Sequence, residues 1–361
     1  MPAPSAPPSD PAPRPSAPAT DAATDPAQAT AAPSKVTIEH VARAAGVSRG
    51  TVSRVLNGGY ASPSSRAKVQ AAIASTGYRT NIHARSLASG RSHVYAAVLS
   101  EPYGELFDDP TFGRMLQGVG SELVGTDIAL NLLFVTTDEE RERTLRQLEP
   151  SRVDGIILLS PHIDDPLLRE LDTAIPTIVC GALDAERPAT WTVTIDDHAG
   201  GLAGARHLVE RGCERVGIIG GPDAAQGAHR RVAGQIEGLG AAALPGAVGH
   251  APYSSAGGAE VMRALLAAHP DLDGVLCGSD RQALGAMAVL REVGRIIPGD
   301  VRVVGFDDHS LAATATPPLT TIHQPIFDVG ATASRLLHTL LGGSPVGSAV
   351  LPTHLIVRSS T

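Results

Sequence analysis

Aromatic residues are scarce in this 361-residue chain, at 3 % of the total with one tryptophan. The three cysteines, Cys180, Cys213 and Cys277, lack the spacing of metal ligands, so we expect buried reduced thiols rather than a disulfide or a zinc site. No apolar run is long enough to span a membrane, and no basic segment followed by an apolar one marks a secretory signal. We therefore expect a cytoplasmic protein without a membrane partner.

Motifs of common enzyme chemistry are also absent. The chain has no GxxxxGK[ST] phosphate loop, GxGxxG fingerprint, GxSxG elbow or HExxH helix. The acid pairs Asp196-Asp197 and Asp307-Asp308 could supply an acid and a base, but adjacent residues point in different directions. Each pair more plausibly gives one ligand contact and one structural hydrogen bond. We therefore expect no enzyme, no cofactor and no metal.

Charge is divided along the chain. Residues 1–34 are dominated by Pro, Ala, Ser and Thr, which cannot bury enough surface to fold, so we expect a disordered tail. Between Lys35 and His93 there are nine Lys or Arg residues against one acid, Glu39, or about +8, whereas the whole chain carries −8. This separation indicates a nucleic-acid-binding module joined to an acidic domain that does not bind nucleic acid.

The basic segment contains a predicted helix-turn-helix, residues 36–57, VTIEHVARAAGVSRGTVSRVLN. Thr37 can cap the first helix, Gly46 can supply a positive-φ turn, and Ser48 can cap a second helix that runs to about Leu56. The apolar residues of both helices fall at spacings that share one core: Ala42, Ala45, Val47, Val52, Val55 and Leu56. The alternative, an amphipathic hairpin that packs on a larger core, is disfavoured by the local charge. A third helix should begin at Ser62-Pro63 and stop at Gly77.

These residues resemble the DNA-binding domain of the lac repressor family of bacterial transcription regulators, and the resemblance extends with few gaps to Arg358. It implies a helix-turn-helix domain at 35–80, a hinge helix at 81–91, and an effector-binding and dimerisation domain at 92–361. In the family, the hinge helices order when two subunits pair on DNA. By position, Leu87 would wedge into the minor groove and Ala84 would face the other hinge, although Leu87 could also be simple linker filler.

The DNA contacts are expected on the second helix and its flanks. Arg49 can take a guanine by a bidentate contact, so we expect it to be the main specificity residue, with Arg54 second. Gly50 has no side chain with which to read a base. The full set of expected DNA contacts is Thr37, Ser48, Arg49, Thr51, Ser53, Arg54, Asn57, Ala84 and Leu87.

After Arg91, strand-like and helix-like segments alternate, which predicts an α/β fold with parallel sheets covered on both faces. The strand-like runs are 94–99, 129–135, 155–159, 177–180, 192–195, 215–220, 274–278, 301–306 and 354–358, and they are too many for one ordinary sheet. The resemblance implies a periplasmic-binding-protein-like core of two lobes joined by three crossovers. One lobe would hold residues 92 to about 195 and 325–352, and the other 196–324 and 353–361.

Ligands of such sheets bind beyond the carboxyl ends of the strands. The residues that follow the strands therefore nominate an effector pocket: Glu101, Phe107, Asp109, Phe112, Ser160, His229, Arg230, Ser279, Asp280, Asp307 and Gln324. In sugar-responsive relatives the residue matching Asp307 clamps hydroxyl groups. An arginine joins it in those relatives, but the equivalent position here holds His229, with Arg230 beside it, and Arg231 is expected to be structural. Phe107, Phe112 and Trp191 could cover the apolar face of a sugar ring, but for any single one of them a core position is favoured.

The sequence thus predicts a homodimeric DNA-binding regulator, a repressor acting at the nucleoid on operator DNA of approximate two-fold symmetry. A small molecule bound between the lobes would shift the population of lobe arrangements and so control operator affinity. A carbohydrate is the first expectation for this effector, and a nucleoside or purine-like ligand is the alternative. A solute-binding protein for a transporter is a further alternative, which the basic segment disfavours.

Overall fold

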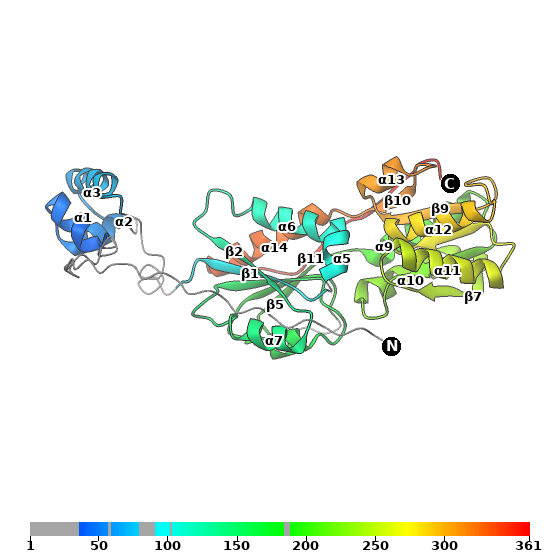
Figure 1. Ribbon diagram of the computed structural model, residues 1–361, viewed down its shortest axis with the longest axis horizontal. Coiled ribbons are helices and arrows are strands. Elements are labelled where there is room, and N and C mark those ends of the chain that lie inside the picture. Colours follow the sequence, from blue (N-terminus) through cyan, green and yellow to red (C-terminus); the bar gives the residue numbers. More distant parts are fainter. Residues whose placement is uncertain (1–35, 57–58, 79–90, 102, 184–187) are drawn as a thin grey trace, which may run out of the picture. The chain divides into compact units, whose positions relative to one another are not determined.

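The computed structural model describes residues 36–56, 59–78, 91–101, 103–183 and 188–361 (Figure 1). The chain forms two compact units, Met1–Asn81 and Ile82–Thr361. The N-terminal tail, Asn57, and the hinge segment with Ala84 and Leu87 lie outside the described residues.

The first unit, the headpiece, is formed by α1 (Ile38–Ala45), α2 (Arg49–Leu56) and α3 (Pro63–Thr76). Gly46 ends α1 with a φ of +63°, which is the left-handed turn predicted there. Ser62 accepts a hydrogen bond from the Ser65 amide and Pro63 opens α3, so both expected helix signals are confirmed. The three helices bury one small core: Val41, Ala45, Val52, Val55, Val69 and Ala72.

The second unit contains two six-stranded sheets. Sheet A is wholly parallel, in the order β11 (Ala349–Leu351), β5 (Thr190–Ile195), β4 (Thr177–Cys180), β3 (Gly155–Leu159), β1 (Val94–Leu99) and β2 (Ala129–Phe134). Sheet B has the order β12 (His354–Ile356), β10 (Thr320–His323), β9 (Arg302–Asp307), β8 (Gly274–Cys277), β6 (Val216–Gly220) and β7 (Ala243–His250). In sheet B the β10–β12 pair is antiparallel and the remaining pairs are parallel.

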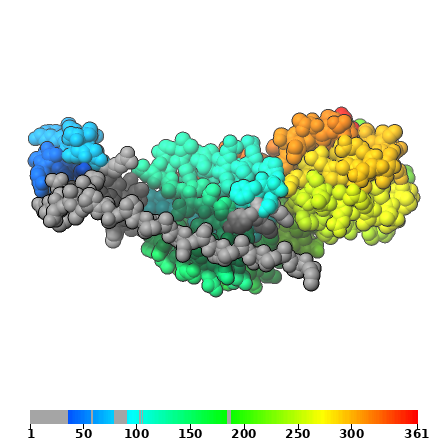
Figure 2. All heavy atoms as spheres, viewed as in Figure 1, coloured from blue at the N-terminus to red at the C-terminus, as the bar shows by residue number. Residues whose placement is uncertain are grey.

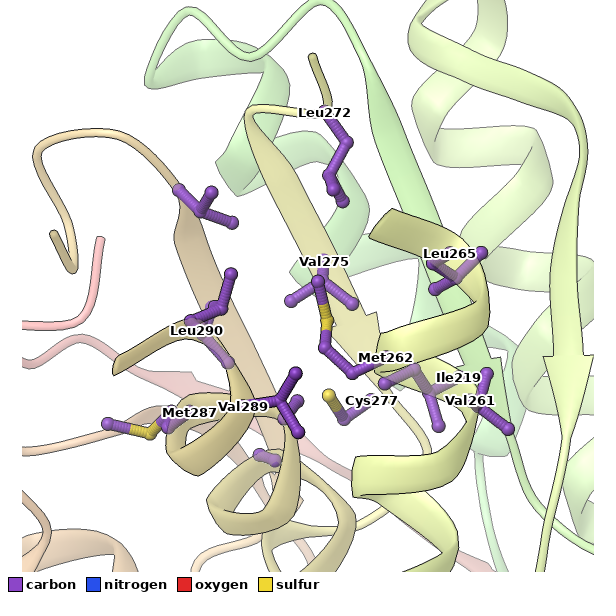
Figure 3. Close-up of a cluster of buried hydrophobic side chains, with 14 of the residues drawn as sticks. Ile219, Val261, Met262, Leu265, Leu272, Val275, Cys277, Met287, Val289 and Leu290 are labelled. Atoms are coloured by element: carbon purple, nitrogen blue, oxygen red, sulfur yellow. The ribbon is translucent and has the colours of Figure 1, made fainter. Parts of the chain in front are cut away.

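Helices cover both faces of each sheet, which gives lobe A around sheet A and lobe B around sheet B. Lobe A carries α5 (Tyr103–Asp108), α6 (Pro110–Ser121), α7 (Asp138–Leu145), α8 (Pro166–Glu170) and α14 (Ile326–Leu341). Lobe B carries α9 (Asp197–Glu210), α10 (Gln226–Leu239), the short η1 (Gly240–Ala242), α11 (Ser255–Ala268), α12 (Asp280–Glu292) and α13 (Ser310–Thr314). Figure 3 shows one core of lobe B, where Val275 and Cys277 of β8 meet Met262 of α11 and Leu290 of α12.

The chain crosses between the lobes three times. It passes from β5 to α9, from β10 to α14, and from β11 to β12. The two lobes and the three crossovers expected from the sequence are therefore present, and each strand predicted from an apolar run lies in one of the two sheets. No helix in the described part of this unit or of the headpiece is both long and apolar enough to cross a membrane.

Three strands were not among the predicted runs: β7, β10 and β11. The residues of β7 read ALPGAVGH, in which Pro245 and Gly246 are poor strand formers, and the β6–β7 register shifts between Val216 and Ile218. Strand β7 lies at the edge of sheet B, where a proline and a bulge are tolerated. Strand β10 has four residues and β11 has three, which is too few for an alternation of apolar and polar residues to be recognised.

Paired glycines allow three pairs of helices to pack at close range. A Cβ added to Gly118 of α6 would collide with the carbonyl oxygen of Phe327 in α14, and one added to Gly330 of α14 would collide with that of Met115 in α6. The same reciprocal arrangement joins α9 to α10 through Gly201 and Gly234, and α11 to α12 through Gly258 and Gly285. These contacts are between backbones, so the neighbour cannot yield by changing a rotamer.

We predict that Gly118→Ala lowers the free energy of unfolding by about 1–3 kcal/mol, because α6 and α14 must separate to admit the methyl group. Gly120→Ala, in the same helix, is the matched control, since a Cβ at Gly120 meets nothing within 4 Å. It should leave stability unchanged or raise it by up to about 1 kcal/mol. Urea unfolding followed by circular dichroism measures both, and equal stabilities would show that the close approach of α6 and α14 is not required.

Candidate functional site

Helix α2 of the headpiece presents an exposed polar face. The Thr51 amide donates to Ser48 Oγ at 3.1 Å, so Ser48 caps the helix as predicted. Arg49 Nε lies 3.4 Å from Glu39 Oε1, and both side chains are more than half exposed. A pair this exposed contributes little stability and can be exchanged for a phosphate or a base.

The structure brings together six of the expected DNA-contact residues. Thr37, at the start of α1, and Ser48, Arg49 and Arg54, on or before α2, are exposed, whereas Thr51 and Ser53 are half-buried on α2. Arg54 Nε donates to the Gly50 carbonyl at 3.2 Å, which holds its side chain along the helix. Asn57, Ala84 and Leu87 fall outside the described residues.

The second unit has a cavity of about 310 Å³ lined by residues of both lobes. This volume falls within the range of small-molecule sites, about 300–1,000 Å³. Most of its wall lies at or beyond the carboxyl ends of β1, β3, β4 and β5 in lobe A, and of β6, β7, β8, β9 and β10 in lobe B. Seven of the predicted effector residues line it: Glu101, Asp109, Phe112, Ser160, Ser279, Asp307 and Gln324.

Four predicted effector residues do not line the cavity. Phe107 is 75 % exposed on α5, with its ring 6.2 Å from that of Phe134. His229 and Arg230 lie on the exposed side of α10, where His229 Nε2 contacts the Asp223 carbonyl at 2.8 Å. Asp280 is fully buried at the start of α12, where it accepts hydrogen bonds from the His309 amide and the Thr321 hydroxyl. Asp280 therefore supports the loop after β9 instead of facing the cavity.

Arg231, which the sequence interpretation treated as structural, lines the cavity, as does Arg281. Its Nη2 lies 2.8 Å from Asp197 Oδ1, its Nη1 donates to the Gly278 carbonyl, and its guanidinium carbon lies 3.4 Å from the centre of the Phe306 ring. Helical geometry explains why Arg231 and not Arg230 lines the cavity, because each residue of α10 is turned about 100° from the previous one. Arg230 therefore faces solvent where Arg231 faces the cavity.

Asp307 sits where the backbone is strained. Its φ is +118°, and Ser160, also in the cavity wall, has a φ of +51°. Non-glycine residues avoid this region, and such outliers concentrate at functional sites. Burial raises the pKa of Asp307, although His309 and Arg231 oppose the rise. Gln324 Nε2 donates to Asp307 Oδ1, which fixes the direction of the carboxyl group.

Several further cavity residues escaped the sequence interpretation: Thr111, His162, Asp197, Tyr253 and Arg281. Tyr253 follows β7, which has no recognisable strand pattern, so the search beyond strand ends did not reach it. Burial raises the pKa of Tyr253 to about 12, so its hydroxyl stays protonated. His162 lies two residues beyond Ser160, and Arg281 lies one residue beyond Asp280. A search that took in one or two more residues after each strand would have included them.

The charged side chains of the cavity wall are paired with one another. Glu101 pairs with His162 at 2.9 Å, Asp197 with Arg231 at 2.8 Å, and Asp109 with Arg281 at 3.5 Å. No group of three or more His, Cys, Asp or Glu residues in the described segments is arranged to hold a metal ion. The wall can thus offer hydrogen bonds and apolar surface, and Asp307 adds one further carboxyl group.

Comparison with known proteins matches both units. Residues 37–81 fit the model of bacterial regulatory proteins of the lacI family, and residues 205–361 fit that of the periplasmic binding protein-like domain. The HTH-type transcriptional regulator CelR of Thermobifida fusca is 38 % identical over 332 residues, which are 90 % of this chain and 98 % of CelR. The ribose operon repressor of Halalkalibacterium halodurans is 33 % identical over 331 residues, 90 % of this chain and 97 % of the repressor.

Solved structures agree with these matches. A complex of the transcriptional regulator CelR with cellobiose superposes with a TM-score of 0.71 at 37 % identity, covering 90 % of this chain and all of that one. The lac repressor dimer bound to operator and the anti-inducer ONPF gives a TM-score of 0.78 at 27 % identity, covering 90 % of this chain and 98 % of that one. From its headpiece, its two-lobed second unit and these relatives, the chain belongs to the LacI family and is a DNA-binding transcriptional regulator.

Proposed function

We propose that this regulator is a repressor whose operator affinity is controlled by an uncharged carbohydrate bound in the cavity between lobes A and B. The observation that carries the proposal is the cavity wall, in which hydrogen-bonding groups stand beside apolar surface and the arginines are already neutralised. The relative CelR, solved with cellobiose, makes a β-linked disaccharide the first sugar to test.

The pairing of charges favours an uncharged ligand. Among the described residues of the wall, Arg231 and Arg281 are the arginines, and each is held by a carboxylate. A phosphate or a carboxylate on the ligand would have to displace Asp197 or Asp109 from its partner, leaving a buried charge unpaired at a cost of several kcal/mol. Sugar hydroxyl groups impose no such exchange, since they both donate and accept hydrogen bonds.

The polar and apolar parts of the wall suit the two surfaces of a sugar ring. The Asp307 carboxyl group can accept hydrogen bonds from sugar hydroxyl groups, and the Gln324 amide can accept or donate them. Arg231 has further N–H donors in the same wall. Phe112 and Tyr253 line the cavity as well and can cover the C–H face of a ring. We assign effector binding to these five residues, with Glu101, Asp109, Ser160 and Ser279 as further candidates.

For DNA, we propose that α2 enters the major groove with Arg49 and Arg54 directed to base edges and phosphates. Because one short helix supplies limited affinity, we propose that the protein acts as a homodimer on an operator of approximate two-fold symmetry. Its place of action would be the nucleoid. The related lac repressor was solved as a dimer on operator. Edge strand β2 also exposes Leu132, and the nearby Phe107 is 75 % exposed, which gives lobe A apolar surface that a second subunit could cover.

The proposed mechanism is a shift in population. The ligand contacts both lobes, so it binds one arrangement of the lobes more tightly than another. If operator DNA favours a different arrangement, ligand and operator oppose each other through the dimer. The sign of this coupling decides whether the sugar is an inducer or a corepressor.

We predict that Arg231→Gln or Asp307→Asn abolishes sugar binding. Both variants remove groups that would contact the ligand, whereas Arg230→Gln, at the adjacent exposed position, should bind as the wild type does. Thermal shift with cellobiose measures this, because a ligand that binds the folded state raises Tm. Loss of binding in Arg230→Gln together with retention in Arg231→Gln would place the pocket on the other face of α10.

The ligand class is tested with the same assay. Cellobiose, glucose 6-phosphate and adenosine represent an uncharged sugar, an anionic sugar and a nucleoside. We expect a shift with an uncharged sugar and none with the phosphate ester, since both arginines among the described wall residues are already paired with carboxylates. A response to adenosine alone would replace the carbohydrate with a nucleoside effector, and a larger shift with the phosphate would contradict the charge argument.

We predict that Arg49→Gln removes the preference for one base pair of each half-site, at a cost of about 1–3 kcal/mol for the preferred sequence. Lys68→Gln, an exposed change on α3, should alter affinity equally for all sequences or not at all. Selection of operators from random DNA with the wild-type protein, followed by binding assays with base-pair variants, measures both. An unchanged preference in Arg49→Gln would assign base reading to other residues.

A further inference from the structure

A cluster of charged groups joins the two lobes at one edge of the cavity. Asp109, which caps α6 in lobe A, lies 3.5 Å from Arg281 Nη1 at the start of α12 and 3.7 Å from His309 Nε2 in the loop after β9, both in lobe B. Thr111 Oγ1 of α6 lies 3.2 Å from the same His309 nitrogen. In Figure 2 the cyan spheres of α5, which ends just before Asp109, adjoin the spheres of lobe B.

These contacts are shielded from water. The side chains of Asp109, Arg281 and His309 are 12, 15 and 8 % exposed. Solvent and salt therefore screen them less than they screen surface ion pairs, and removal of one partner leaves a buried charge uncompensated. The Ile163 amide and the Ala224 carbonyl make a second link between the lobes, at 2.7 Å, but no ionisable side chain takes part in it.

Carboxylates from both lobes face His309. Asp109 approaches it from α6, Asp307 from the end of β9 at 3.5 Å, and Asp280 from the start of α12 through the His309 amide. Arg281 on α12 and Arg231 on α10 are the nearby cations, and Arg231 is already held by Asp197. Without the charge of His309, Asp109 of lobe A would face the acids of lobe B across the cleft with Arg281 as their main counter-charge.

We propose that Asp109, Arg281 and His309 form a clasp that holds lobes A and B together, and that the clasp is tight when His309 is protonated and loosens when it is neutral. The clasp requires neither effector nor DNA, so a test of the clasp can fail while the proposed function holds, and the reverse. It would make the lobe equilibrium, and any response that depends on it, sensitive to pH.

The direction of the pH dependence follows from the charges. Burial lowers the pKa of His309, but the close contact with Asp109 and the charges of Asp307, Asp109 and Asp280 outweigh burial and raise the pKa to about 8. The pKa of Asp109 is lowered, because its contact with His309 and its hydrogen bond from the Thr111 amide outweigh its burial, so Asp109 stays ionised. The stabilisation is fully present below the ordinary histidine pKa of about 6.5 and is lost as pH rises through about 8.

The three free cysteines provide the assay. Cys180 lines the cavity, whereas Cys213 and Cys277 lie in the cores of lobe B, and all three are buried. Opening of the lobes should expose Cys180 alone, and global unfolding should expose all three. The full-length protein is treated with N-ethylmaleimide, and the labelling rate of each cysteine is read by peptide mass spectrometry.

At pH 7, His309→Gln and Asp109→Asn should label Cys180 about tenfold faster than the wild type, because each variant loses the ion pair between His309 and Asp109 across the cleft. Cys213 and Cys277 should be unaffected. Asp165→Asn is the matched control, because Asp165 caps α8 within lobe A before a proline, just as Asp109 caps α6. For His309→Gln the excess over the wild type should disappear above pH 9, where His309 of the wild type is neutral as well.

Equal Cys180 rates in Asp109→Asn, Asp165→Asn and the wild type would overturn the clasp. If a variant is unstable and labels all three cysteines faster, the proposal is tested instead by the pH dependence of labelling in the wild-type protein. Its ratio of Cys180 to Cys213 labelling should rise several-fold between pH 6.5 and pH 9, and a flat ratio would overturn the proposal.

Discussion

Three crossings of the chain between its lobes constrain the whole second unit. The chain passes to the other lobe after β5, β10 and β11, and the carboxyl ends of the parallel strands of both sheets meet at one cavity. Loops that follow strands far apart in the sequence, such as those bearing Ser160 and Asp307, therefore share one wall. A ligand in that wall touches both lobes and can bias their arrangement.

Much of this could be predicted from the sequence, and the failures have physical causes. Rules for strand ends located Ser160, Ser279 and Asp307, since the carboxyl edge of a parallel sheet is set by topology alone. Those rules could not orient side chains on a helix such as α10, where Arg231 and not Arg230 lines the cavity, and they did not reach Tyr253 after the irregular β7. The positive φ of Asp307 and the clasp at Asp109 depend on tertiary contacts that no local pattern encodes.

Rigid lobes and a polar cleft play complementary roles. Reciprocal glycines lock α6 to α14 in lobe A, and α9 to α10 and α11 to α12 in lobe B, so each lobe can move as a unit. Between the lobes, the charged contacts at Asp109 can form and break without disturbing either core. A small change in ligand or proton binding at the cleft can thus become a displacement of whole lobes, which is what control of a paired DNA-binding headpiece requires.

The central claim is that ligand binding in the cleft changes operator binding, and fluorescence anisotropy tests it most directly. Labelled operator is titrated with the protein in the presence and absence of the sugar that raises Tm. The account predicts a change in operator Kd of about 5–150-fold, and operator must change the Kd for the sugar by the same factor. A sugar that binds the cleft and leaves the operator Kd unchanged would contradict the account.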